Sequence, residues 1–202
     1  MAIRFYDEAI TEKIKAWIKD PNLKVLSPND STRLFQLRAD EHLDKPLTLP
    51  LIAISRDSDY EILSTAKRTL SYDGGHIAAN EDKSELLNAI PVRISYQLDI
   101  YCKYFAEADE YAREFIFKLI NQPNIRIELP YNNSKIVHDS SINLESTVSD
   151  NSNIPEKLIS GQFTRLSIRF NLNDAYLFSI PFMKNWKIEE TNKIIVQEEG
   201  EI

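Results

Sequence analysis

The hydrophobic pattern of the chain is clearest between residues 87 and 129, where its period changes twice. From residue 92 to residue 100, apolar and polar residues alternate, which predicts a strand with one apolar and one polar face. From Ala106 onward, apolar residues recur at steps of three and four, which predicts an amphipathic helix. Pro123 ends this helix, and alternation resumes over residues 125–129. The stretch therefore predicts a strand, a helix and a second strand in succession.

A further strand of similar quality is predicted over residues 165–172, where polar residues again occupy every other position. The simplest interpretation of two such polar faces is an antiparallel sheet with one face in water. The alternative is a surface that lines the inside of a ring or meets a partner, since charged and amide side chains at contacts set orientation and partner choice. The candidate interface residues are Arg93, Gln97, Asp99, Arg165 and Arg169, together with Trp186 in the C-terminal segment.

The rest of the chain predicts one more helix, four short strands and two loops. An apolar stripe predicts an N-terminal helix over residues 9–18. Short strands are predicted over residues 23–26, 47–54, 60–63 and 66–72. A turn and an exposed loop are predicted between residues 73 and 84. Residues 131–161 are rich in Asn, Ser and Asp and predict a long polar loop, in which weak alternation over residues 142–148 leaves a strand or hairpin open.

Together these elements predict an α+β fold, with a mixed, mostly antiparallel sheet flanked by two main helices. A chain of 202 residues is long enough for one large domain with a proper core. We expect that domain to span residues 1–177. Residues 178–202 are expected to form a C-terminal arm or extra strands, and they end in an acidic tail.

The composition narrows the class of protein. The formal net charge of −7 argues against a phosphate-binding surface, because affinity for nucleic acid depends on neutralising phosphates with Lys and Arg. No apolar stretch approaches the ~20 residues that a bilayer requires. We therefore expect neither a specific nucleic acid nor a membrane as partner. The single cysteine, Cys102, cannot form an internal disulfide, so the fold has to rely on packing alone.

The residues that could carry chemistry form no recognisable motif. His42, His76 and His138 lie far apart in three polar segments, without a second ligand at metal-binding spacing, and we expect them to be surface histidines. Cys102 follows a strong strand in an apolar setting, which is typical of a buried thiol. We therefore expect no catalytic residue, no cofactor and no metal.

One stretch resembles a known family. Residues 90–101 (IPVRISYQLDIY), followed by Glu107-Ala108-Asp109-Glu110 and residues 115–120, are similar to the tail terminator or tail completion proteins of long-tailed, contractile bacteriophages and phage-derived particles. Residues 161–172 and Ala175-Tyr176-Leu177-Phe178 fit the same pattern. The resemblance covers about half of the chain, and its motifs are packing motifs.

The resemblance implies a structural virion protein with no enzymatic activity. Relatives are α+β domains that assemble as a ring, typically a hexamer, which caps the growing tail and provides the joining surface to the head or neck. The implied partners are further copies of the chain, the tail tube or sheath protein, and neck or connector proteins. The implied location is the virion tail, after assembly in the host cytoplasm. The isolated chain is compatible with a monomer that closes into a ring only on a template.

Two alternatives stay open at this point. The first is a neck or head–tail adaptor protein, which the same residues barely distinguish from a terminator. The second is a small soluble α+β enzyme or ligand-binding domain. A cleft in which His42, His76 or His138 converges with carboxylates would favour that second alternative.

A chain shortened to end near Leu177 is expected to lose self-assembly or to fold poorly, because the apolar-rich C-terminal segment is a candidate for reaching a neighbouring copy. Size-exclusion chromatography with light scattering measures the effect. A shortened chain that stays folded and self-associates as well as the full chain contradicts this role of the arm.

Overall fold

The computed structural model describes residues 3–31, 48–63, 70–72, 76–78, 87–131, 134–153 and 162–178. The two main helices are α1 (Ile3–Trp17) and α3 (Phe105–Asn121). The strands are β1 (Lys24–Leu26), β2 (Leu51–Ile62), β3 (Leu70–Tyr72), β4 (His76–Ala78), β5 (Leu87–Cys102), β6 (Asn124–Tyr131), β7 (Ser134–Asp150) and β8 (Thr164–Phe178).

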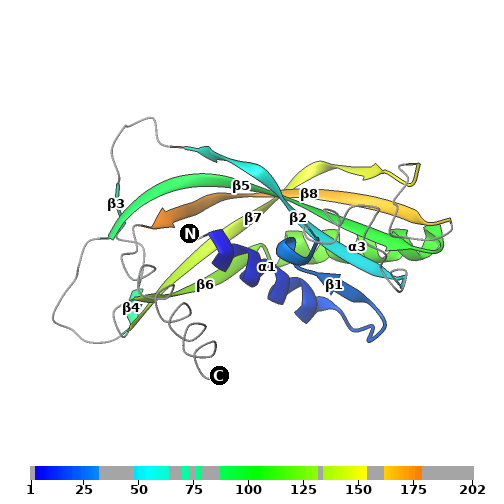
Figure 1. The fold of residues 1–202 in the computed structure, drawn as a ribbon, viewed down its shortest axis with the longest axis horizontal. Coiled ribbons are helices and arrows are strands. Elements are labelled where there is room, and N and C mark those ends of the chain that lie inside the picture. The colour runs from blue at the N-terminus through cyan, green and yellow to red at the C-terminus, as the bar shows by residue number, and fades with distance from the viewer. Residues whose placement is uncertain are drawn as a thin grey trace, which may run out of the picture.

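The strands form one sheet in the order β1-β2-β5-β8-β7-β4, with β3 paired to β5 and β6 paired to β7. The pairing of β1 with β2 is parallel, and the other described pairings are antiparallel. The long strands β2, β5 and β8 curve over the two helices, which lie on the concave side of the sheet (Figure 1). The expected α+β fold with a mixed, mostly antiparallel sheet is therefore confirmed.

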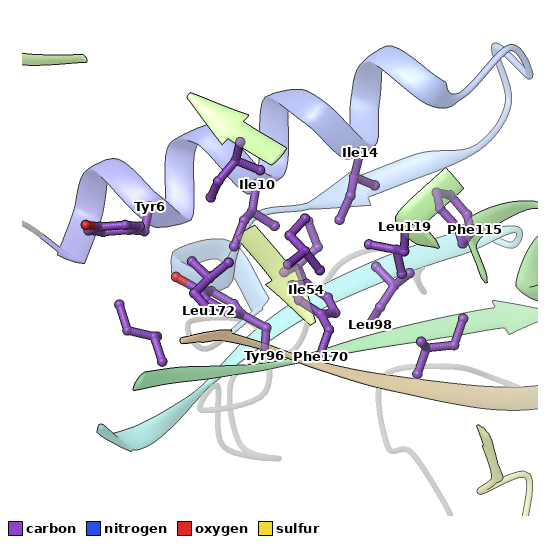
Figure 2. Close-up of a cluster of buried hydrophobic side chains, with 14 of the residues drawn as sticks. Tyr6, Ile10, Ile14, Ile54, Tyr96, Leu98, Phe115, Leu119, Phe170 and Leu172 are labelled. Atoms are coloured by element: carbon purple, nitrogen blue, oxygen red, sulfur yellow. The ribbon is translucent and has the colours of Figure 1, made fainter. Parts of the chain in front are cut away.

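The core lies between the helices and the inner face of β5 and β8. These two strands are paired over most of their length, so their alternating apolar residues stand opposite one another, as in Leu98 facing Ile168. Tyr96 stacks on Phe170 with ring centroids 5.5 Å apart. Figure 2 shows these side chains meeting apolar residues of α1 and α3 in one cluster. Burial of the apolar face of each strand and helix in this one core stabilises these elements.

A buried polar clamp fastens α1 to the sheet. Asp7 of α1 is almost fully buried, and its carboxylate accepts a hydrogen bond from the Tyr96 hydroxyl (2.8 Å) and one from the Arg56 guanidinium (2.8 Å). Burial raises the pKa of Asp7, and the contacts with Tyr96 and Arg56 oppose that rise. The clamp joins the N-terminal helix to both β2 and β5, three segments far apart in the sequence.

The strands that flank the β5–β8 pair each contain a bulge, and the two bulges lie on opposite sides of the Tyr96–Phe170 pair. β2 advances by four positions from Arg56 to Tyr60, where β5 advances by two. β7 does the same between Leu144 and Val148 against β8. Such bulges add extra residues to one strand of a pair and increase its bend. They therefore interrupt the flanking strands on either side of the β5–β8 pair.

The long polar loop predicted over residues 131–161 is wrong for residues 134–150, which form β7, and the strand left open over residues 142–148 is confirmed. The alternation over residues 142–148 belongs to this strand, whose second half pairs with β8 and whose side chains are mostly exposed. An exposed flanking strand such as β7 has only a weak apolar pattern, so its amino-acid composition resembles that of a loop. The loop predicted before Ser84 is also wrong in part, since residues 76–78 form β4.

Other predicted boundaries shift. The strands predicted over residues 47–54 and 60–63 are largely one strand, β2. The strand predicted over residues 66–72 is confirmed at β3, which begins at Leu70. The C-terminal arm beyond Phe178 lies outside the described residues, so the domain boundary near residue 177 stays a prediction.

Replacing Asp7 with Ala is expected to lower the free energy of unfolding by about 2–3 kcal/mol, because the Tyr96 hydroxyl and Arg56 lose their acceptor. Urea unfolding at pH 7 measures the loss. The matched control is Glu8→Ala, which removes only an exposed pair with Arg4 and is expected to cost less than about 0.5 kcal/mol.

The loss should depend on pH with a defined sign. The pKa of Asp7 is raised in the folded state, so folding favours the protonated carboxyl. This contribution is fully present below the ordinary pKa of 3.8 and is lost as the pH rises through the raised value. The difference in stability between the natural chain and Asp7→Ala is therefore larger at pH 4 than at pH 7. An equal difference at both pH values contradicts the raised pKa of Asp7.

Candidate functional site

The polar positions of β5 and β8 form a ladder on the outer face of the sheet, away from the helices. The strand register sets Gln97 opposite Arg169 and Asp99 opposite Ser167. Five of the six candidate interface residues therefore lie together on two neighbouring strands. The alternation predicted two polar strand faces, and the pairing of β5 with β8 sets them side by side. The sixth, Trp186, lies outside the described residues.

Asp99 is the centre of this polar ladder. It is only 3% exposed, although it stands on the polar side of the strand. Its carboxylate accepts hydrogen bonds from Arg165 Nε and Nη2 (3.2 and 3.0 Å), from the Gln97 amide (2.8 and 3.0 Å) and from the Ser167 hydroxyl. The Arg165 guanidinium also lies over the Tyr101 ring, 5.4 Å from its centroid. A buried carboxylate needs such partners, because losing water without replacing its hydrogen bonds is costly.

The ladder becomes more exposed toward the other end of β5. Arg169 Nε donates to Gln97 Oε1 (3.0 Å), so Gln97 bridges the arginine and Asp99. Arg93 donates to Glu61 (2.6 Å) and to Asn173 (2.7 Å), both exposed contacts. Internal partners hold these side chains in place. The outer face is therefore a polar surface whose side chains have a fixed arrangement.

A cleft of about 440 Å³ opens beside the ladder, at the bulge of β2. Its lining residues are Asp57, Ser58, Asp59, Tyr60, Glu61, Arg93 and Ser95. Sequence analysis identified Arg93 but missed the three carboxylates. The available signal was their spacing, because Asp57, Asp59 and Glu61 occupy every second position and share one side of an extended chain.

The expectation that all three histidines lie on the surface is wrong for His138. It is 4% exposed, and its ring meets those of Tyr6, Tyr176 and Phe178 edge-on. Its Nε2 lies 2.9 Å from the Asp174 carbonyl oxygen. Burial lowers the pKa of His138, and Asp174 opposes that shift. The covering rings come from α1 and β8, which no local pattern around residue 138 reveals.

The remaining residues that could carry chemistry are His42, His76 and Cys102. His42 lies outside the described residues, and nothing in the structure defines the side chain of His76. Cys102 is buried as expected, and burial raises its pKa to about 12, so the thiol stays protonated at neutral pH. Across the described ranges, no group of histidine, cysteine or carboxylate side chains is arranged to hold a metal ion.

Large apolar side chains are exposed on and beside α3. Tyr104, Phe105, Phe117 and Ile120 are 57–63% exposed, while Phe115 and other residues on the opposite face of the helix pack in the core. Phe117 and Ile120 are one turn apart and form a small patch. Exposed apolar patches of this kind mark contact surfaces more often than isolated residues do.

Comparison with known proteins gives no assignment: no protein-family model matches the chain, and no curated protein matches its sequence. Within the described part of the chain, neither helix has the length and apolar character needed to cross a membrane. Function therefore has to be inferred from the surfaces described above.

Replacing Arg165 with Met is expected to lower the free energy of unfolding by about 3 kcal/mol, because Asp99 stays buried without its cation. Arg169→Met, at the exposed part of the ladder, is expected to cost less than about 1 kcal/mol. The double change Asp99→Asn with Arg165→Met should recover part of the loss. Denaturant unfolding of the natural chain and the three variants measures these free energies of unfolding. Equal losses of stability for the two arginine variants contradict the central role of Asp99.

Proposed function

We propose that this protein is a structural component of a phage-type tail that assembles as a ring, caps the tail tube or sheath, and offers the joining surface to the neck. The observation that carries the proposal is the exposed apolar surface of α3. It lies within the strand–helix unit that resembles tail terminator proteins. The role is non-enzymatic, and the ring size expected from the resemblance is six.

The segments that carry the resemblance form one contiguous unit, which supports the proposal. Residues 90–101 lie in β5, the following motif lies in α3, and residues 164–178 form β8. β5 pairs with β8, and α3 packs across both strands. The resemblance therefore follows the centre of the fold. Shared packing motifs are expected to lie there when two proteins share an architecture.

Two unlike surfaces on opposite sides of the molecule also support it. The outer side of α3 is apolar at Phe117 and Ile120, whereas the outer face of the sheet is the polar ladder. Head-to-tail association needs two different surfaces, and it closes into a ring when the rotation between copies divides a full turn. A stable contact of this kind would bury on the order of 1,200–2,000 Å².

The test is electron microscopy of negatively stained tail tubes, assembled from the tube protein encoded in the same gene cluster and mixed with the purified chain. We expect ring-shaped caps at the tube ends. Replacing Phe117 and Ile120 with Asp should abolish the caps, because charged side chains would then stand where an apolar contact is needed. Arg113→Asp is the matched control, since it adds charge on the same exposed side of α3 without removing an apolar group.

Each outcome has a meaning. Bare tube ends with the natural chain contradict the proposed function. Caps that form equally well with the Phe117 and Ile120 variant contradict the role of α3 but leave the tail function standing. Light scattering of the same samples distinguishes rings formed in solution from rings formed only on the tube.

A further inference from the structure

Beyond residue 53, β2 forms an open edge of the sheet (Figure 1). β1 pairs with β2 only at Leu51–Ala53, and β5 occupies the other side of β2. Among the described residues, no strand pairs with the outer side of β2 from residue 54 to residue 62. An edge of this kind presents unpaired backbone groups to which another extended segment can add.

The backbone groups of Tyr60 and Ile62 point outward at this edge. The Leu63 amide donates to the Pro91 carbonyl oxygen (3.0 Å), and Ile62 is paired with Val92. In an antiparallel pair, residues bonded to the partner strand alternate with residues whose N–H and C=O point away from it. Ile62 therefore belongs to the second kind, and so does Tyr60, two residues earlier in the same register. Both residues can donate and accept backbone hydrogen bonds with an added strand.

The side chains along this edge have different chemistry on the two faces of the sheet. Tyr60 and Ile62 stand opposite core positions of β5, yet they are 39% and 58% exposed because the sheet ends there. Glu61 stands on the outer face and lines the cleft, together with Asp57 and Asp59. Within the described ranges, neither Asp57 nor Asp59 forms an ion pair. The edge is therefore apolar on one face and has excess negative charge on the other.

This charge argues against a second copy of the chain as the occupant of the edge. Two β2 edges would bring carboxylates together across the pair, which is unfavourable. Residues 143–150 of β7 are a second exposed stretch of strand, and they carry Glu145 and Asp150 and no cation. A β7 edge would therefore also meet β2 with like charge. The fitting occupant is a segment of another protein that has cations where β2 has carboxylates.

The pleat of a strand specifies the order of residues in that segment. Successive side chains of an extended chain point to opposite faces of a sheet. If apolar residues of the segment cover Tyr60 and Ile62 on one face, the residues between them lie on the other face, beside Glu61 and the cleft. Lysine or arginine at these intervening positions would meet Asp57 and Asp59. The edge therefore selects an extended segment in which apolar and basic residues alternate.

We propose that the β2 edge at residues 60–62 binds an extended segment of a partner protein, in which apolar residues alternate with lysine or arginine, and that this segment adds to the sheet as a strand. Its cations bind the carboxylates of the cleft, and its apolar residues cover Tyr60 and Ile62. The inference does not depend on the proposed tail function. The tail caps sought by microscopy and the binding measured below can therefore fail independently.

The first test measures the binding of two synthetic peptides to the full chain by fluorescence anisotropy. One is a blocked heptapeptide that alternates valine and lysine, and the other has the same composition with its lysines grouped at the ends. We expect the alternating peptide to bind about tenfold more tightly or better, because only its order places all the cations on one face of a strand. Equal affinities of the two peptides, or no binding of the alternating peptide, overturn the proposal.

The second test removes the charge of the cleft. Asp57→Asn combined with Asp59→Asn should weaken binding of the alternating peptide about tenfold or more, because its lysines lose their partners. The matched control is Glu12→Gln with Asp109→Asn, which removes the same charge at exposed positions of α1 and α3 and should leave the affinity unchanged. Equal losses of affinity mean that net charge alone attracts the peptide, and they overturn the proposed site.

The third test addresses addition as a strand. Ile62→Pro removes the outward N–H of residue 62 and leaves the hydrogen bond between Leu63 and Pro91 in place, whereas Ile62→Ala removes the side chain and keeps the N–H. The proline variant should bind the alternating peptide about fivefold more weakly than the alanine variant, as expected for the loss of one hydrogen bond. Urea unfolding checks that both variants are folded.

Equal affinities of these two variants overturn strand addition. If Ile62→Pro instead lowers self-association in sedimentation experiments and leaves peptide binding unchanged, the occupant is a second copy and the proposal is overturned. The asparagine variants keep the natural backbone, so the site stays testable even if Ile62→Pro unfolds.

Discussion

The antiparallel pairing of β5 with β8 is the interaction on which the rest of the structure depends. The two strands stay in register over residues 94–102 of β5, where the core positions Ile94, Tyr96, Leu98 and Ile100 each meet an apolar position of β8. The same register necessarily sets their polar positions side by side on the opposite face. One pairing thus creates both the packed core and the polar ladder, as alternation with a period of two requires.

The two faces are each fastened by a buried carboxylate. On the inner face, Asp7 ties α1 to Tyr96 and Arg56. On the outer face, Asp99 ties β5 to Arg165 and Ser167. Buried charges are expensive to desolvate, so these groups stabilise the fold only as complete networks, and each one specifies which segments must meet. This specificity fixes the shape of both faces of the sheet.

The proposed contacts use features at the margins of this framework. α3 leaves apolar side chains outside the core, and β2 leaves an open edge beside an acidic cleft. A ring assembled as proposed would join the apolar surface of α3 to the polar face of the sheet. The bulges of β2 and β7 interrupt the flanking strands, which discourages indiscriminate edge-to-edge pairing.

The sequence by itself determined β5, α3 and β8, because each buries one continuous face and its period is visible locally. It also predicted one polar face for the strand that carries Arg93, Gln97 and Asp99 and another for the strand that carries Arg165 and Arg169. The pairing of β5 with β8 brings these two faces together. Only the tertiary structure decided that residues 134–150 form a strand, that His138 is buried among distant rings, and that Asp99 is desolvated. These outcomes depend on which remote segment covers a residue, and a local pattern of apolar and polar positions contains no information about that partner.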